Sequence, residues 1–354
     1  MKKALKIVGI ILIVIAVIAV SYVAYVLIAY HRIGDTPLEV TVGKAAEADV
    51  ADYTVVSYNI GFGAYESDYG FFMDGGDKSW AWSEERLDKN LKNIAKTLSE
   101  QNADIYFIQE VDIDSTRTYG VDERPYLTEA LPDMYHVFAQ NFDSPFLFYP
   151  FHQPHGIARS GIMTFSKPGI YLAGRVELPV ESGLTKLVDL DRCYSKCRVM
   201  LRNEKNMVLY NFHLSAYTSD GAIATKQLEL LLADMQSEYE KGNYCVAGGD
   251  FNKDILGDSS QYFGKADKEY TWAQPVPEGV FDGKNITLVA PLDKNDPVPS
   301  CRNADSAYHP GQLVLTIDGF LVSENVDVVS SEVIDTGFAY SDHNPVKMTL
   351  SLKG

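Results

Sequence analysis

Three patterns of hydrophobic and polar positions divide this chain. The first is an unbroken apolar run: residues 7–30 contain no charged side chain and are mostly Ile, Val and Ala, and Lys2, Lys3 and Lys6 precede them. A helix spans the hydrocarbon core of a bilayer with about 20 apolar residues. The apolar region of a cleaved signal peptide is shorter, about 7–15 residues, and no convincing small-residue cleavage site follows this run. The run therefore predicts an uncleaved membrane anchor over residues 1–32, in contact with the lipid bilayer.

The second pattern has the helical period, with apolar residues three and four positions apart. It predicts an amphipathic helix over residues 84–100, marked by Leu87, Leu91, Ile94 and Leu98. It predicts a second helix through Leu228, Leu231, Leu232 and Met235. Between the anchor and the first of these helices, residues 33–50 are rich in Gly, Pro, Ala and Glu, which is typical of a juxtamembrane linker.

The third pattern consists of short apolar runs, which are typical of buried strands. These runs cover residues 54–58, 104–109, 161–166, 207–212, 244–247, 313–322, 326–329 and 346–352. Strands and helices recur without strict alternation, which favours a mixed sheet or two packed sheets with outer helices. We interpret residues 188–201 as a hairpin around a cysteine-containing loop. Residues 111–160 and 253–313 show no clear pattern, and we find no internal repeat.

Charge indicates how the chain is oriented and what it binds. Three lysines precede the apolar run and only His31 and Arg32 follow it closely, so the positive-inside rule places the N-terminus in the cytoplasm and residues 51–354 outside the cell. The chain carries −17, and residues 1–34 hold four basic residues and no acid, so the remainder carries −21. Such a domain lacks a general attraction for nucleic-acid phosphates, although a bound divalent metal changes the local field. No protein partner is evident.

The four cysteines leave their pairing open. Outside the cell, a bridge between Cys193 and Cys197 across a tight loop is compatible with their spacing, and four cysteines allow three connectivities. Cys245 lies in an apolar strand and Cys301 in a loop rich in Pro and Asn. No cysteine spacing matches a zinc site.

Polar residues recur where the apolar strands end. The candidate site residues are Asn59, Glu110, His213, Asp250 and Asn252 at strand ends, Asp318 within an apolar strand, and Asp342 and His343 before the last strand. Each has an ordinary alternative, because Asn and Asp are common in turns and a lone buried histidine is usually a hydrogen-bonded core residue. As a set they are the groups that bind Mg²⁺ through carboxylates while histidines transfer protons.

These residues stand in motifs whose order is recognisable. The chain contains Val-Ser-Tyr-Asn59, Ile-Gln-Glu110, Asn-Phe-His213-Leu, Gly-Gly-Asp250-Phe-Asn252, Ile-Asp318-Gly-Phe and Ser-Asp342-His343-Asn-Pro. In this order they resemble the endonuclease/exonuclease/phosphatase superfamily, which includes DNase I-like nucleases, neutral sphingomyelinases and inositol polyphosphate 5-phosphatases. The resemblance covers residues 51–352. It implies an α+β fold: a four-layer α/β/β/α sandwich of two mixed sheets with outer helices, here preceded by one transmembrane helix.

The resemblance also implies a metal centre. Glu110 corresponds to the main ligand of Mg²⁺, with Mn²⁺ as the alternative ion, and Asn59 and Asp342 lie in or near its coordination shell. Asp250 and Asn252 correspond to residues that orient the attacking water and hold a phosphate oxygen.

The remaining site residues correspond to groups that transfer protons. Asp318 pairs with His343, which activates water or stabilises the transition state, while His213 contacts the phosphate or protonates the leaving oxygen. Which residue acts as the base stays open. Arg159 precedes a strand and could reach the same phosphate, or else it faces solvent.

The sequence therefore predicts a membrane-anchored, Mg²⁺-dependent phosphoesterase that acts on a phosphodiester or phosphomonoester. Tethering and acidity favour a lipid headgroup or a small phosphorylated molecule. The alternatives are a tethered extracellular DNase-like endonuclease, an inactive binding module of the same fold, and a scaffold whose polar residues are only turns. Aromatic residues at Phe71, Phe72, Trp80 and Trp82 could touch lipid, but such residues more often belong to a core.

Overall fold

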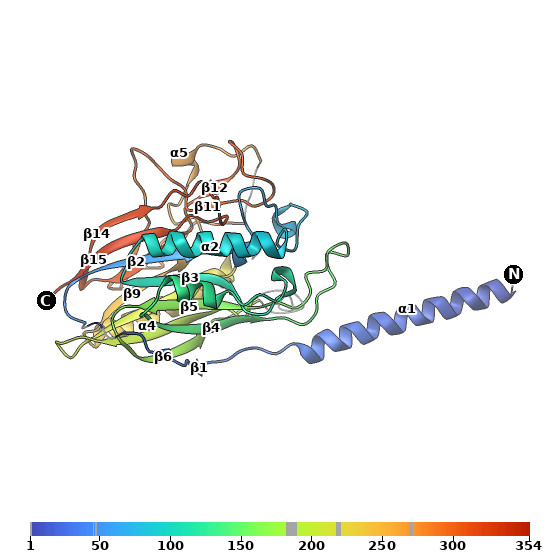
Figure 1. Ribbon diagram of the computed structural model, residues 1–354, viewed down its shortest axis with the longest axis horizontal. Helices are drawn as coiled ribbons and strands as arrows, with labels where there is room; N and C mark the ends of the chain where they lie inside the picture. The colour runs from blue at the N-terminus through green and yellow to red at the C-terminus, as the bar shows by residue number, and fades with distance from the viewer. Residues whose placement is uncertain (1, 45, 47, 182–189, 217–220, 269–271) are drawn as a thin grey trace.

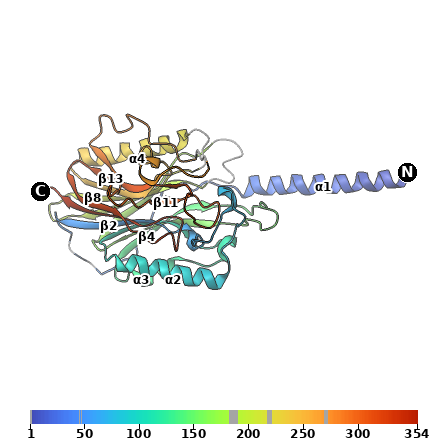
Figure 2. The same cartoon turned by 90° about the horizontal axis from the view of Figure 1, so that it is seen from above.

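Two β-sheets packed face to face form the centre of the protein. The computed structural model describes residues 2–44, 46, 48–181, 190–216, 221–268 and 272–354. One sheet has seven strands in the order β1-β6-β7-β8-β9-β13-β10, and the other has six in the order β14-β15-β2-β3-β5-β4. Helices cover the outer faces on opposite sides, α4 over one sheet and α2 with α3 over the other (Figure 2). This is the predicted four-layer sandwich.

The elements have the following bounds. The seven-stranded sheet comprises β1 (Thr36–Pro37), β6 (Ile170–Glu177), β7 (Cys193–Met200), β8 (Asn206–His213), β9 (Tyr244–Asp250), β13 (Asp318–Ser323) and β10 (Ile286–Val289). The six-stranded sheet comprises β14 (Val326–Val333), β15 (Val346–Leu352), β2 (Asp52–Asn59), β3 (Ile105–Asp112), β5 (Arg159–Ser166) and β4 (Tyr135–Asp143). A separate two-stranded ribbon joins β11 (Cys301–Arg302) and β12 (Val314–Leu315). The α-helices are α1 (Lys2–Ala29), α2 (Glu84–Glu100), α3 (Arg124–Ala130), α4 (Ala222–Glu240) and α5 (Ser260–Phe263).

Three apolar clusters hold the layers together. Between the sheets, inward-facing side chains such as Val55, Phe107, Val246 and Phe320 are fully buried. A second cluster joins α2 to the outer face of the six-stranded sheet, and a third joins α4 to the seven-stranded sheet. Successive side chains of a strand point to opposite faces of its sheet. One face of each sheet therefore packs against the other sheet, and the opposite face packs against a helix.

Each sheet contains one pair of parallel strands, and this arrangement positions the site. β2 pairs with β3 in parallel, and β8 pairs with β9 in parallel, while the other pairings are antiparallel. Two parallel neighbours must be joined by a crossover connection. Helix α2 lies in the connection from β2 to β3, and α4 lies in the connection from β8 to β9. The carboxyl ends of these strands lie at one end of the sandwich, since Asn59 at the end of β2 bonds to Asp250 at the end of β9.

The hairpin predicted around the cysteines was wrong, and the structure settles the pairing that the sequence left open. β7 is one continuous strand that pairs with β6 on one side and β8 on the other, so residues 190–201 do not form the expected hairpin, while residues 188–189 lie outside the described residues. Cys193 and Cys197 lie on this strand as buried free thiols. Four residues of extended chain separate their backbones by about 13 Å, and a disulfide needs Cα atoms within about 7 Å.

The segment that follows α1 lies against the two sheets. Thr36 pairs with Arg175 of β6, and the amide of Leu38 donates to the carbonyl of Ala173 at 3.0 Å. Thr41 then bridges to His136 of β4. Residues 33–44 therefore run along the edges of both sheets, which fixes the base of α1 relative to the domain.

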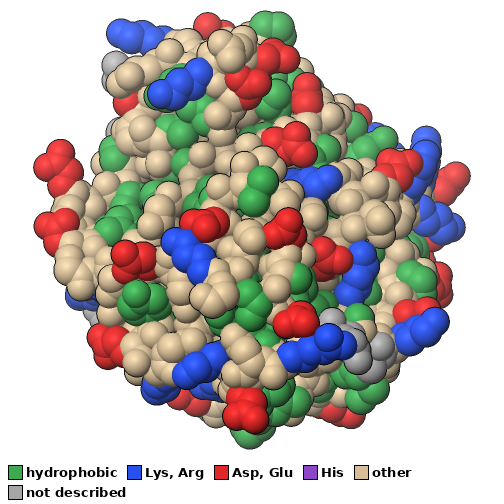
Figure 3. Space-filling model, turned by 90° about the vertical axis from the view of Figure 1, so that its left-hand side faces the viewer, with side chains coloured by type: hydrophobic (Ala, Val, Ile, Leu, Met, Phe, Trp, Pro, Cys, Tyr) green, Lys and Arg blue, Asp and Glu red, His purple; other side chains and the backbone are tan. Residues whose placement is uncertain are grey.

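α1 projects from the domain at the end opposite the C-terminus (Figure 1). It is the one helix of the described residues that is long and apolar enough to cross a membrane by length and composition. The opposite end of the molecule carries acidic and basic side chains scattered among apolar ones (Figure 3). One end of the molecule thus carries charged side chains, whereas an apolar helix leaves the other end.

Candidate active site

Asn59, the last residue of β2, connects the two sheets at the carboxyl ends of the parallel strands. Its buried Nδ2 donates to Glu110 Oε1 and to Asp250 Oδ2, both at 3.1 Å. Its Oδ1 accepts from the amide of Gly61 at 3.0 Å. Gly61 has φ 54, and a Cβ there would lie 3.1 Å from Asp342 Oδ1, so this turn needs a glycine.

Glu110 reaches the cleft through a distortion of its strand. The expectation that the strand ends at Glu110 was wrong, because β3 continues to Asp112. The register with β5 shifts between Ile108 and Val111, and Glu110 has φ 57. Such a bulge redirects a side chain that regular alternation would place elsewhere. The carboxylate consequently meets Asn59 at the strand edge.

His213 and Asp250 end the parallel strands β8 and β9 and are direct register partners. His213 Nε2 lies 3.5 Å from Asp250 Oδ2 and 3.9 Å from Glu110 Oε1. The amide of Asn252 donates to Asp250 Oδ1 at 2.8 Å, and its side-chain Nδ2 donates to the carbonyl of Leu214 at 2.8 Å. Asn252 therefore fixes the loop that orients Asp250.

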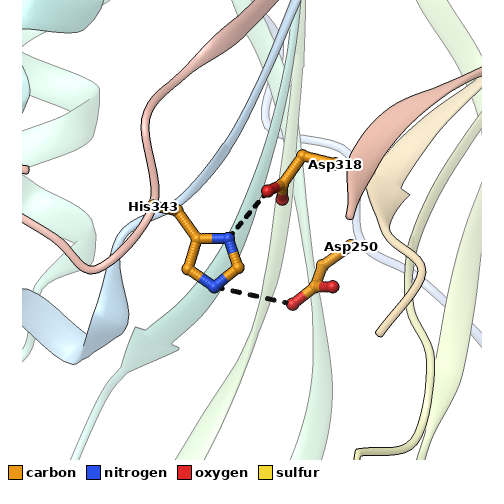
Figure 4. A group of neighbouring side chains, drawn as sticks. All are labelled: Asp250, Asp318 and His343. Carbon is orange, nitrogen blue, oxygen red and sulfur yellow. Dashed lines mark hydrogen bonds and ion pairs between the residues drawn. The ribbon is translucent and has the colours of Figure 1, made fainter. Parts of the chain in front are cut away.

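His343 lies between two carboxylates (Figure 4). Its Nδ1 is 2.8 Å from Asp318 Oδ2, and its Nε2 is 3.8 Å from Asp250 Oδ2. Ser300 Oγ donates to the same Asp318 oxygen at 2.7 Å and accepts from the amides of Ile317 and Asp318. Asp318, the first residue of β13 rather than an interruption within a strand, is thereby held rigidly behind the imidazole.

Most of these side chains line one cleft with a volume of about 130 Å³, while Asn59, Asp318 and Ser300 lie behind its wall. Glu110, Asn252, Asp342 and both histidines, His213 and His343, border it. Aromatic residues, including Phe62, Phe71 and Trp272, form other parts of the wall. The site is thus a narrow polar cleft with buried carboxylates and imidazoles at its base.

Comparison with known families identifies this arrangement. Residues 56–343 match the model of the endonuclease/exonuclease/phosphatase family. The chain belongs to this family. It is therefore a metal-dependent hydrolase that acts on phosphate ester bonds. No curated protein matches the sequence.

Solved structures of the family share the fold at low sequence identity. A family member from Beutenbergia cavernae is 17% identical, with 86% of this chain and 72% of that chain covered and a TM-score of 0.55. The human Nocturnin catalytic domain with bound sulfate is 16% identical, with 89% and 98% covered and a TM-score of 0.53. ANGEL2, a 2′,3′-cyclic phosphatase, is 17% identical, with 90% and 99% covered and a TM-score of 0.55. At these identities the similarity establishes the fold.

The family implies a divalent metal, and the residues at Glu110 fit one. Burial raises the pKa of Glu110, and the neighbouring Asp342 adds to this shift. Burial also raises the pKa of Asp342, although His343 and Arg302 act against it. Glu110 and Asp342 are partly exposed carboxylates that face the same cleft, and a bound cation stabilises such neighbours as anions. Their hard oxygen atoms suit Mg²⁺ or Mn²⁺.

A second trio, Asp250, Asp318 and His343, has ligand atoms within 4.8 Å of one another, but proton transfer explains it better. The Nδ1 of His343 is already engaged by Asp318. Although burial acts to lower it, the pKa of His343 is raised well above its usual value by Asp318, Cys301 and Asp342. An imidazole that keeps its proton is a poor metal ligand. The trio is therefore a His–Asp pair facing a carboxylate.

Burial gives the two other groups at the base of the cleft unusual protonation behaviour. It raises the pKa of Asp250 to about 7, with Asp318 adding to the effect and His343 opposing it. It lowers the pKa of His213 well below its usual value, helped by Arg192 and His343. His213 is thus neutral at a pH near 7, where Asp250 gains or loses its proton. Asp250 can therefore accept a proton at this pH, whereas His213 does not hold a second one.

Arg159 is the predicted residue that the structure does not bring to the cleft. Its exposed side chain pairs with Asp114 at 2.6 Å and with Asp143 at 3.2 Å. Arg117, Arg192 and Arg302 line the cleft instead. The sequence did not reveal these three arginines, because none of them stands in a recognisable motif. Ser300, which donates a hydrogen bond to Asp318, was missed for the same reason.

Proposed function

We propose that this protein is a membrane-anchored, Mg²⁺-dependent phosphoesterase with an extracellular catalytic domain. Its substrate is a phosphodiester or phosphomonoester of a lipid headgroup or a small phosphorylated molecule. The observation that carries the proposal is Asn59, whose amide holds Glu110 and Asp250 in one hydrogen-bonded group from opposite sheets. A turn residue would not need such a position at 1% exposure.

The proposed metal site uses Glu110 as the principal ligand, with Asp342 beside it. Asn59 presents a donor to Glu110 Oε1, so its role is to orient that carboxylate. A divalent ion bound there neutralises charge that develops on the phosphate oxygens during hydrolysis.

Hydrolysis requires a water oxygen to bond to phosphorus while a P–O ester bond breaks. Asp318 fixes Nδ1 of His343, so Nε2 faces Asp250 across 3.8 Å. Asp250, whose pKa burial raises to about 7, receives the proton that the attacking water loses. His213 lies on the other side of Asp250, where its neutral imidazole donates a hydrogen bond to the phosphate. The departing oxygen takes its proton from His343, whose pKa is raised well above its usual value.

The acidic domain argues against long nucleic acids as substrates. Binding a duplex releases counterions when basic side chains neutralise many phosphates, whereas residues 35–354 carry −21. The three arginines near the cleft are buried or partly buried and can serve a single phosphate group. A small or headgroup phosphate fits this charge distribution better.

The proposal is tested by comparing substrates side by side with Mg²⁺ and with EDTA. Sphingomyelin vesicles, a soluble phosphoinositide and plasmid DNA are incubated with the full chain, and phosphate-containing products are quantified. We expect EDTA-sensitive hydrolysis of the lipid or inositol substrate. Efficient nicking of the plasmid with little hydrolysis of the other two would instead identify a tethered nuclease and contradict the proposed substrate class.

A further inference from the structure

An exposed aromatic loop lies beside the anchor helix. The loop comprises residues 146–151 between β4 and β5, and the exposed fractions of Phe148, Tyr149 and Phe151 are 52%, 64% and 85%. By contrast, Phe71 of the predicted aromatic segment is buried in the core. Aromatic residues this exposed are unusual in a water-soluble surface. Their position relative to α1 indicates what covers them.

The loop is bonded directly to α1. Tyr22 Oη donates to the carbonyl of Phe146 at 3.0 Å and accepts from the amide of Phe148 at 3.2 Å. Tyr25 Oη accepts from the amide of Phe146 at 3.1 Å. The rings of Tyr22 and Phe148 are 5.2 Å apart in an edge-to-face arrangement. Figures 1 and 2 both show the loop projecting on the side of the domain from which α1 leaves.

The positions of Tyr22 and Tyr25 along α1 indicate how deep in a bilayer these contacts lie. A hydrocarbon span of about 20 residues counted from Ile7 ends near Val26. With a rise of about 1.5 Å per residue, Tyr22 and Tyr25 lie in the last turn or so of that span, next to its outer boundary. Tyrosine is enriched at the membrane–water interface, which begins at this boundary. A loop that contacts Tyr22 and Tyr25 consequently lies at the same level.

The composition of the surrounding segment agrees with this depth. Residues 144–158 contain no Asp, Glu, Lys or Arg, although the domain is strongly acidic. The base of the segment is ordered by paired backbone bonds between Leu147 and Gly156. An uncharged, well-anchored aromatic tip suits the interface of a zwitterionic bilayer, where aromatic rings partition without requiring anionic lipid.

The loop is continuous with the wall of the active-site cleft. His155 lines the cleft, and its backbone amide donates to the carbonyl of Tyr149 at 3.2 Å. The ring of Phe72 lies 5.7 Å from that of Tyr149 and 6.2 Å from that of His155. The neighbouring Phe71 also lines the cleft. Hydrogen bonds and ring contacts therefore connect the loop of residues 146–151 to the wall of the active-site cleft.

We infer that the loop of residues 146–151 enters the outer interface of the bilayer that α1 spans, and that the cleft hydrolyses the phosphate ester of a zwitterionic lipid headgroup in that same membrane. This inference rests on the proposed function and names its substrate class. Water supplies the oxygen that bonds to the headgroup phosphorus, and the ester oxygen that departs takes a proton, as described above. The anchor and the loop together hold the cleft at the bilayer surface.

Insertion is measured without any activity readout. The F151W variant is reconstituted in phosphatidylcholine vesicles, and quenching by lipids brominated near the ester groups is compared with that of the unsubstituted chain, which has three tryptophans of its own. L172W is the matched control, since Leu172 is 53% exposed on β6. That position lies five residues, about 16 Å along the strand, from Glu177, whose amide donates to Asp35 shortly after the end of α1.

The inference predicts additional quenching for F151W and none for L172W. Equal quenching of the two variants, or none for F151W, would overturn it. Added anionic lipid is expected to leave the quenching unchanged or to lower it, because the domain is acidic. Loss of quenching in pure phosphatidylcholine with recovery in anionic vesicles would contradict the zwitterionic partner.

The substrate class is tested with the double variant F148S/F151S. We expect it to cleave lipid in vesicles at least about 10-fold more slowly. The variant lacks the two exposed aromatic rings whose transfer from water into the bilayer favours membrane contact. Its hydrolysis of a soluble chromogenic phosphodiester is expected to stay at the wild-type rate, as is that of the control Y171S/L172S on both substrates. Failure of the proposed function looks different: the wild type would then cleave neither substrate in an EDTA-sensitive manner. Wild-type hydrolysis of the soluble ester alone, or full lipid hydrolysis by F148S/F151S, would refute only this inference.

Discussion

Asp250→Asn is expected to lower kcat by about 10³-fold while leaving the fold intact. Asp250 is the residue on which the site converges: it accepts from Asn59 and from the amide of Asn252 and lies within 3.8 Å of both catalytic imidazoles. Asparagine keeps the shape of the side chain but cannot take a proton. The measurement is steady-state hydrolysis of a soluble phosphodiester with saturating Mg²⁺.

The same substitution is expected to preserve or raise the thermal midpoint in metal-free buffer. Burial raises the pKa of Asp250 to about 7 in the folded protein, whereas an unfolded aspartate has a pKa of about 3.9. The folded state thus binds more protons, so this carboxyl costs stability increasingly as the pH rises from about 4 to about 7. Asparagine removes that cost. A midpoint that falls sharply together with activity would indicate a structural role instead.

Asp234→Asn serves as the matched control for Asp250→Asn. Asp234 lies on α4 and pairs with Lys196 and Tyr194 of β7, outside the cleft. We expect a stability change of about 1 kcal/mol or less from this partly exposed group and an unchanged kcat. A comparable loss of activity in both variants would show that any lost aspartate impairs the enzyme.

Glu110→Gln is expected to weaken Mg²⁺ binding and to lower activity at limiting Mg²⁺ by about 100-fold or more. Glutamine can still accept from Asn59, but it lacks the charge that holds a cation. Isothermal titration with Mg²⁺ and with Mn²⁺ measures binding directly, and activity is measured across a range of metal concentrations.

Glu123→Gln controls for the loss of a buried glutamate. Glu123 is fully buried, accepts from the amide of Asp112 and does not line the cleft. Burial and Asp112 raise its pKa well above the usual value, so a neutral amide is a mild replacement. Metal affinity and kcat are expected to match the wild type. Unchanged metal binding in Glu110→Gln would rule out the proposed ligand.

The sequence predicted those features that depend on short-range periodicity. Helix α2 has the predicted bounds, and the apolar runs before Asn59, His213 and Asp250 are strands that end where expected. Parallel pairing places His213 beside Asp250, since parallel strands present their carboxyl ends at one edge, and the packing of the two sheets then brings Asn59 to them. Strand identity and motif order were therefore sufficient for most of the site.

Features that depend on long-range contacts could not be predicted. The turn of Glu110 into the cleft depends on a bulge against β5, which has no signature in the residues around it. Arg159 was chosen because it precedes a strand, yet Asp114 and Asp143 hold it outside. The exposed loop of residues 146–151 was indistinguishable from a core segment, because exposure of an aromatic residue depends on what the rest of the fold covers.

Hydrolysis in ¹⁸O-labelled water most directly tests the claim that this cluster is a metal-dependent phosphoesterase centre. The full chain is stripped of metal with EDTA, given Mg²⁺ again, and incubated with a soluble phosphodiester, and the products are analysed by mass spectrometry. The account predicts one ¹⁸O atom in the phosphate-containing product, formed only after Mg²⁺ is restored. Label in the alcohol product, or turnover that persists in EDTA, would contradict it.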